Sequence, residues 1–395
     1  MLTSIKNNSL LIVAAVIVGL VIGAIDTVFG RVLLFVSDFR DSHLAWILPF
    51  LALAGLVSVW LYQRFGGEAG KGMGLVFEVG HEKRDDIPKV LIPLIMVATW
   101  LTHLFGGSAG REGVAVQIGA TVSHWLGKLI PLQNSSRIFL VTGMAAGFAG
   151  LFQIPLAATF FAIEVLVVGE LAFSALLPAL IASLVASQTS HALGLEKFAV
   201  PVSVHLDLEP LVVVKLLVLG LCFGLVGSLF AASLAWAKKQ ASTYFTNPYW
   251  RIALISLCLT VLFFLLWQGR YTGLGTNLIS ASFSGGKIYA WDWALKLVLT
   301  VITLAAGFQG GEVTPLFAIG ASLGVVLAGF FGLPVALVAG LGYVSVFGSA
   351  TNTLLAPILL GGEVFGFANT PYFAIVAVAA FLFSHKHTIY ALQKR

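Results

Sequence analysis

Residues 106–114 read GGSAGREGV, a flexible glycine loop that leads into an apolar segment. A helix that begins here has first backbone N–H groups without partners inside the helix, and together with the helix dipole they attract anions. Glu112 falls in the predicted first turn, where its own carboxylate would occupy the anion position until protonation neutralised it. Glutamate is also a common dipole-complementing residue at ordinary helix starts, but inside a membrane protein an ionisable side chain favours a functional role.

The composition is that of a membrane protein. Charged residues are 10% of the 395 residues and apolar residues 59%, whereas a soluble globular protein carries about 25% charged residues. The first apolar stretch, Leu10 to Val36, is long enough to span a bilayer and is predicted to be a retained helix. The net charge of +5 is thinly spread, so no nucleic-acid partner is expected. The 8 histidines show no metal-binding pattern, and we expect neither a metal nor a cofactor.

Apolar segments follow one another along the whole chain with only short polar breaks, chiefly 66–89, 238–250 and 269–293. None is long enough for a soluble domain, so we expect a single transmembrane domain over residues 1–395. Several apolar runs, such as 334–348, are too short to span, and glycine and proline interrupt many others. Irregular backbone at membrane depth is tolerated only inside protein or beside a wet cavity, which predicts broken or re-entrant helices.

An internal repeat is visible at a constant offset along the chain. The matching pairs are Gly110 with Gly311, Ile118 to Ala120 with Ile319 to Ala321, and Gly147 with Gly348. Two related halves with interrupted helices at corresponding places are typical of transporters whose site lies between the halves. We expect a first repeat over about 10–195 and a second over about 205–395.

Two further loops share the composition of the first. Residues 307–315 read GFQGGEVTP at the repeat-related position, where Glu312 is another acid beside a broken helix and Pro315 suits a first helical turn. Residues 70–74 read GKGMG before an apolar stretch. A nucleotide-binding loop is excluded there, because the Walker pattern requires glycine where the chain has Phe65 and Ser or Thr where it has Gly72.

Together these segments resemble the signature loops of the CLC family of chloride channels and proton antiporters. The matching segments are 110–113 (the loop of the gating glutamate), 152–157, 161–164, 273–279, 310–315 and Tyr390, which falls where the family keeps the tyrosine that closes the anion path from the cytosol. The resemblance implies an all-α polytopic membrane protein with the CLC-type fold of two inverted repeats and broken, re-entrant helices. It also implies a homodimer with one pathway per subunit, and we expect no cytoplasmic regulatory domain.

The departures from the family pattern indicate one branch of it. Met73 replaces the serine that donates to chloride, Val313 replaces the usual phenylalanine, and Glu312 precedes it. Val165 stands where chloride/proton antiporters place an internal proton-carrying glutamate. This set resembles the bacterial fluoride/proton antiporters of the CLC-F branch. Fluoride is small and strongly hydrated, and a protonated Glu312 would donate it a short hydrogen bond. Taken alone, Met73 also fits simple packing, because methionine fills irregular gaps.

The predicted function is secondary active antiport that exports fluoride in exchange for protons and confers fluoride resistance, in the plasma membrane of a bacterium. Glu112 is the predicted gating and proton-carrying residue. The predicted anion-binding residues are Met73, Gly110, Arg111, Gly113, Glu312, Val313, Thr314 and Tyr390. Two alternatives stay open. One is a CLC-type chloride channel or chloride/proton antiporter. The other is a membrane-embedded enzyme, for which the sequence shows no His-Glu-x-x-His zinc motif.

Overall fold

The computed structural model describes residues 2–131, 134–204, 206–383 and 387–394, with only the backbone of 2–8. Within these ranges the regular structure is helical, apart from two isolated backbone bridges. The helices are α1 (Leu2–Ser42), α2 (Leu44–Ile47), α3 (Leu51–Leu61), α4 (Met73–Gly80), α5 (Leu91–Leu104), α6 (Glu112–Gly127), α7 (Ser135–Phe152), α8 (Pro155–Glu164), α9 (Leu176–Ala192), α10 (Pro210–Tyr244), α11 (Pro248–Leu265), α12 (Thr276–Ser284), α13 (Asp292–Ala306), α14 (Val313–Phe331), α15 (Val335–Thr351), α16 (Leu355–Phe365) and α17 (Thr370–Phe381).

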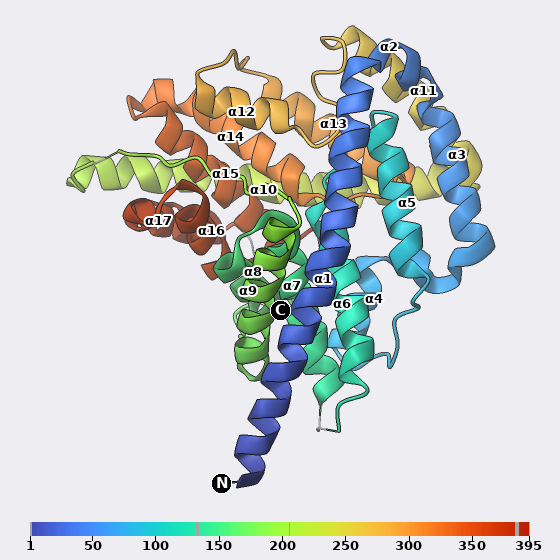
Figure 1. Cartoon of the computed structure of the whole chain (residues 1–395). Helices are drawn as coiled ribbons and strands as arrows, with labels where there is room; N and C mark the ends of the chain where they lie inside the picture. Colours follow the sequence, from blue (N-terminus) through green and yellow to red (C-terminus); the bar gives the residue numbers. More distant parts are fainter. Residues whose placement is uncertain (1, 132–133, 205, 384–386, 395) are drawn as a thin grey trace.

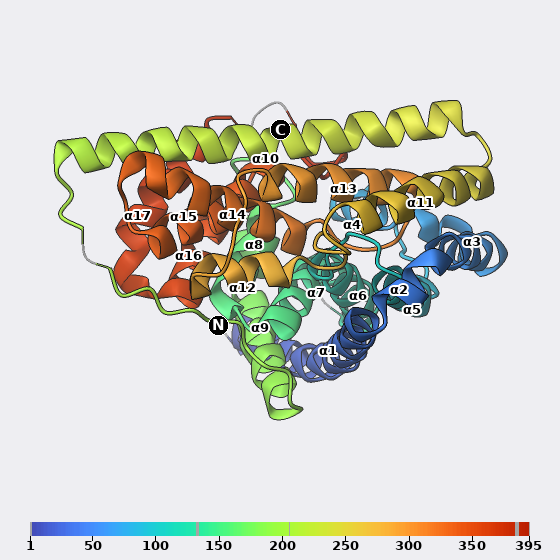
Figure 2. The same cartoon turned by 90° about the horizontal axis from the view of Figure 1, so that it is seen from above.

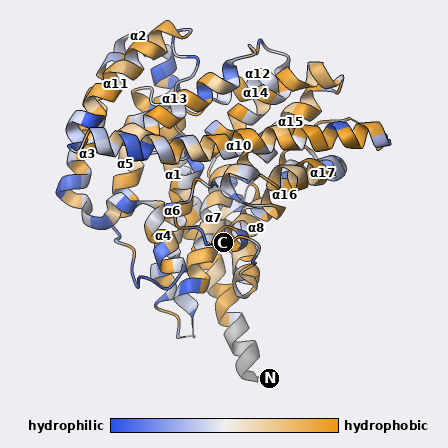
Figure 3. Ribbon diagram, turned by 180° about the vertical axis from the view of Figure 1, so that it is seen from behind, coloured by the Kyte–Doolittle hydropathy of each residue, from blue (hydrophilic) through white to orange (hydrophobic). Residues whose placement is uncertain are grey.

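Among the described residues, 7 helical stretches are long and apolar enough to cross a membrane. They are Ser9–Ser42, Leu44–Gly80, Ser135–Phe152, Phe173–Ala192, Pro210–Tyr244, Pro248–Leu265 and Val313–Phe331. Other apolar helices, including α8, α15 and α16, are shorter. Apolar residues run along most of the helices (Figure 3). The prediction of a polytopic helical membrane protein with interrupted segments is confirmed.

The order of helices repeats along the chain. Helices α4 to α8, of 8, 14, 16, 18 and 10 residues, are followed by a second series of similar lengths, α12 to α16, of 9, 15, 19, 17 and 11 residues. Two helix crossings show the similarity between the two series in detail. A Cβ added at Gly119 of α6 would collide with the backbone of Gly143 in α7, and one added at Gly320 of α14 would collide with Gly342 in α15. The glycines that matched in the sequence therefore stand where the central helices of each half cross most closely.

Helix α10 is a single helix of 35 residues that runs along one side of the molecule, while α1 and α9 lie on the opposite side (Figure 2). The first turns of α1 extend beyond the other helices (Figure 1). Between these sides, α6, α7, α14 and α15 are buried along most of their length. The N-termini of α6 and α14 consequently lie inside the protein.

Helix α1 is longer than predicted and continues past Val36. Near the end of the helix, the Arg40 side chain is nearly buried, donates to the carbonyl of His103 at 2.9 Å and pairs with Asp41 at 2.8 Å.

Two of the predicted polar breaks contain short helices. Helix α4 lies within 66–89 and follows Gly72, which has φ of 52°. Helix α12 lies within 269–293, between Gly275 and Gly285 with φ of 87° and 73°. Residues 205 and 395, the limits of the predicted second repeat, lie outside the described residues.

Candidate anion site

The loops that precede α6 and α14 are joined to each other by backbone. Gly110 and Gly311 exchange two N–H···O hydrogen bonds of 2.5 and 2.7 Å and form an antiparallel bridge. Gly106 and Gly307 begin the two loops with φ of 90° and 113°, a region that glycine enters without steric cost. The glycines predicted to interrupt the helices thus bring helix N-termini from the two halves into contact.

The Glu112 carboxylate reaches the N-terminus of α14. Its Oε2 accepts hydrogen bonds from the Thr314 hydroxyl, from the Thr314 N–H at 3.1 Å and from the Arg111 N–H at 3.3 Å. Oε1 is 3.6 Å from Nε of Arg111 and has no hydrogen-bond partner among the described residues. Glu112 is fully buried. A carboxylate therefore occupies a helix N-terminus of the kind that binds anions.

A cavity of about 450 Å³ reaches Gly113, the residue that follows Glu112, and we call it the Tyr390 vestibule. Four of the predicted residues line it: Met73, Gly113, Glu312 and Tyr390. Tyr390 is 5% exposed and packs on Phe77 with ring centroids 5.2 Å apart. A Cβ added at Gly113 would be 3.7 Å from Oε2 of Glu312, so the start of α6 adjoins the second carboxyl group.

The other predicted residues form a buried layer around Glu112. Gly110 and Arg111 precede it, while Val313 and Thr314 supply the first turn of α14. None of these four lines the Tyr390 vestibule. The structure therefore divides the predicted site into a buried layer around Glu112 and an accessible layer around Glu312.

Lys238 and Gln117 are among the polar residues of the vestibule that sequence reasoning missed. Lys238 belongs to α10, and its Nζ is 3.8 Å from Oε1 of Glu312. Gln117 lies one turn into α6 and donates to the carbonyl of Gly113 at 3.1 Å, while its Oε1 has no partner among the described residues. The sequence could have indicated Gln117, because it lies one helical turn after Gly113 and so on the same face of α6. It could not have indicated Lys238, because only tertiary packing brings α10 to the vestibule.

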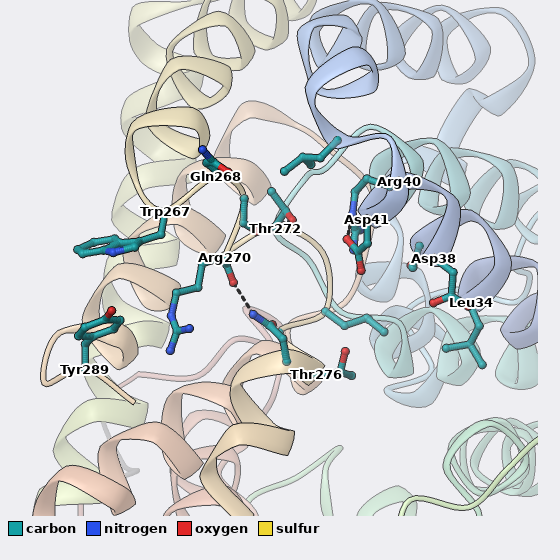
Figure 4. A pocket seen from close by; sticks show the side chains of 16 residues that line it. Leu34, Asp38, Arg40, Asp41, Trp267, Gln268, Arg270, Thr272, Thr276 and Tyr289 are labelled. Carbon is teal, nitrogen blue, oxygen red and sulfur yellow. Dashed lines mark hydrogen bonds and ion pairs between the residues drawn. The ribbon is translucent and has the colours of Figure 1, made fainter. Parts of the chain in front are cut away.

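A second cavity of about 530 Å³, the Arg40 cavity, opens between the end of α1 and the loop 267–277 (Figure 4). Its charged lining residues are Asp38, Arg40, Asp41 and Arg270, so bases and acids are equal in number. Arg270 donates to Asp292 at 3.1 and 2.6 Å, and this hydrogen bonding raises the pKa of Arg270.

The loop 106–110 has the Gly-x-Ser-x-Gly spacing of a hydrolase nucleophile turn. Ser108 is fully buried, however, and its hydroxyl lies 2.8 Å from the Thr300 hydroxyl and accepts from Lys296 at 2.9 Å. Among the described residues, no histidine is hydrogen-bonded to the Ser108 hydroxyl. In the same part of the chain, no group of His, Cys, Asp and Glu side chains is arranged to hold a metal ion.

Comparisons with known proteins agree with this geometry. The family model described as voltage gated chloride channel matches residues 54–385. A chloride/fluoride channel protein of Pseudomonas syringae pv. tomato is 34% identical over 385 residues, covering 96% of this chain and 85% of that protein. The crystal structure of a CLC-type fluoride/proton antiporter matches with a TM-score of 0.96 at 57% identity and covers 97% of each chain. A slow cyanobacterial Cl⁻/H⁺ antiporter, at 21% identity, shares the fold with a TM-score of 0.83, covering 97% of this chain and 96% of that one.

Proposed function

This chain belongs to the voltage gated chloride channel, or CLC, family, and on that basis we propose that it is a secondary active antiporter that exports fluoride in exchange for protons. Its fold is that of a CLC antiporter. The membrane-capable helices and the bacterial relatives make it an integral protein of the plasma membrane. The observation that carries the proposal is the Glu112 carboxylate bonded to the first turn of α14, beside a vestibule that contains Met73 and Glu312.

In the proposed mechanism, fluoride and the Glu112 carboxylate compete for the same donors. The ionised carboxylate takes the Thr314 N–H and hydroxyl, which are the donors a dehydrated fluoride needs. Protonation removes the negative charge of Glu112, weakens those bonds and releases the side chain. The anion then takes the vacated donors while Glu112 carries the proton. One residue thereby links the movements of the two ions.

We place the Tyr390 vestibule on the cytosolic side, as the family resemblance of Tyr390 implies. Glu312 lines this vestibule and is partly exposed, and in its protonated form it would donate a hydrogen bond to an entering fluoride. Met73, at the start of α4, presents a thioether where chloride-transporting relatives have a hydroxyl donor. These two residues favour a fluoride/proton antiporter over the alternative, a chloride channel or chloride/proton antiporter.

The assembly and the division of the chain are part of the proposal. We propose a homodimer with one pathway per subunit, on the family resemblance. We also propose one transmembrane domain whose halves cover about 10–195 and 205–395, supported by the repeated order of helices. Ion transport is the activity of the family, and we propose that this chain likewise catalyses no chemical reaction.

The test is anion efflux from liposomes that contain the purified protein and are loaded with either fluoride or chloride, with proton uptake recorded at the same time. We expect fluoride efflux that drives protons inward, with little release of chloride. Rapid chloride efflux without proton movement would contradict the proposal and establish a chloride channel. Chloride efflux coupled to protons would establish a chloride/proton antiporter.

A further inference from the structure

Lys238 reaches the Tyr390 vestibule from α10 and forms a loose ion pair there. Its Nζ lies 3.8 Å from Oε1 of Glu312, which is too long for a hydrogen bond. The Lys238 side chain is 49% exposed and that of Glu312 is 17% exposed. Charge rather than a directed bond holds the pair, and the flexible lysine stem allows the ammonium group to change partner.

The Tyr390 vestibule carries an excess of positive charge. Its charged lining residues are Lys71, Lys238, Arg251 and Glu312. Lys71 pairs with two acids outside the lining, Glu68 and Glu78. Arg251 donates to the carbonyl of Ala306 at 3.3 Å. Lys238 therefore differs from the other two bases, because its acidic partner is itself a proposed fluoride ligand. The Arg40 cavity has no such excess.

We propose that Lys238 is the anion-capture residue of the Tyr390 vestibule, pairing with Glu312 when the vestibule is empty and with fluoride when it is occupied. This inference rests on the proposed function. A protonated Glu312 has lost the charge that attracts Lys238, and a fluoride that enters beside it restores one negative charge within reach. The net charge around the ammonium group is the same in both states, so capture leaves no unpaired charge in the cavity.

Positive charge at the vestibule that faces the cytosol also suits export. Cations that line a cleft raise the local concentration of anions and the rate at which they arrive. A transporter that exports a dilute anion binds it more often when such a charge lies where the anion enters. We therefore expect loss of the Lys238 charge to weaken the apparent affinity for fluoride and to leave the maximal rate of fluoride transport nearly unchanged.

The test compares Lys238→Gln with Lys239→Gln, which removes the same charge from the neighbouring exposed lysine outside the vestibule lining. Initial rates of fluoride efflux are measured in liposomes over a series of fluoride concentrations at low and high ionic strength. Lys238→Gln should raise the half-saturating fluoride concentration about threefold, as expected for a half-exposed charge pair. Salt should raise the half-saturating concentration of the wild type and have much less effect on this variant. Lys238→Arg and Lys239→Gln should behave like the wild type.

Two results would overturn the inference. One is a half-saturating concentration for Lys238→Gln equal to that of the wild type at both ionic strengths. The other is an equal shift in Lys239→Gln, which would show an effect of general surface charge. A wild type that moves chloride in place of fluoride would instead refute the proposed function. The same titration with chloride would then decide the role of Lys238 separately.

Discussion

Glu164 and Glu363 each bind the first backbone amides of the other's helix. Glu164, at the end of α8, accepts from three consecutive N–H groups beginning at Leu354, at the start of α16. Glu363, near the end of α16, accepts from Leu156 and Ala157 at 3.0 and 2.8 Å, at the start of α8. The exchange is symmetric between the halves. Two helix N-termini that would attract anions are thus occupied by fixed carboxylates, whereas the start of α14 holds the carboxylate assigned here to transport.

Glu164→Gln should lower the stability of the protein. The substitution removes the negative charge and replaces one acceptor oxygen with an NH₂ group, which leaves amides at the start of α16 without an acceptor. The expected loss is about 1–3 kcal/mol. Thermal unfolding in detergent measures it, with the exposed Glu170→Gln as control. Equal transition temperatures for the two variants would show that this cap contributes nothing.

Glu112→Gln should abolish proton-coupled fluoride transport. Glutamine keeps the size of the side chain but can neither carry a proton nor compete as an anion for the donors of Thr314. Fluoride efflux and proton uptake are recorded together in liposomes, with Glu170→Gln again as control. Coupled transport at the wild-type rate in the Glu112 variant would refute the mechanism while leaving the fold untouched.

Thr314→Val should slow fluoride turnover about tenfold or more. The substitution removes the hydroxyl that donates to Glu112 and, in the proposed mechanism, to fluoride in turn, and a hydrogen bond to a charged group contributes about 1.5–3 kcal/mol. The backbone N–H of residue 314 remains, so transport should still be coupled to protons. Thr314→Ser retains the hydroxyl and should recover most of the rate. If serine were as slow as valine, packing of the methyl group and not hydrogen bonding would be responsible.

Met73→Ser should increase chloride flux relative to fluoride flux. Serine adds a hydroxyl donor at the start of α4, where it faces the Tyr390 vestibule. Met73→Ala is the matched variant, since it removes the thioether without adding a donor. The ratio of chloride to fluoride efflux is the measured quantity. An equal change in both variants would show that the lost methionine, and not the added hydroxyl, sets selectivity.

Asp292→Asn should destabilise the end of the molecule that contains the Arg40 cavity. Asp292 is fully buried and accepts from Arg270, from the Tyr271 hydroxyl at 2.6 Å and from the Tyr289 N–H at 2.8 Å. Breaking a buried pair costs about 3–5 kcal/mol, and the lower end applies because the Arg270 side chain is 21% exposed. Unfolding in detergent measures the loss. Fluoride transport at moderate temperature should persist, which separates this variant from those at Glu112.

The sequence was most informative where glycine interrupts an apolar segment. Gly110 and Gly311 matched in the repeat and are hydrogen-bonded to each other in the structure, because each opens a helix that meets its counterpart. It was least informative for contacts between distant helices. The partners of Glu164 and Glu363 are backbone amides, which no residue type reveals, and Lys238 reaches Glu312 only because α10 passes the vestibule.

The backbone bridge between Gly110 and Gly311 limits how this protein can change shape. Both of its hydrogen bonds are made by main-chain atoms, so no side-chain movement loosens them. Rocking one half against the other, the usual motion of transporters built from inverted repeats, would break both bonds. The bridge holds the two loops together through their backbones. In the proposed mechanism, the exchange of ions beside this bridge accordingly rests on rotation of side chains, above all that of Glu112.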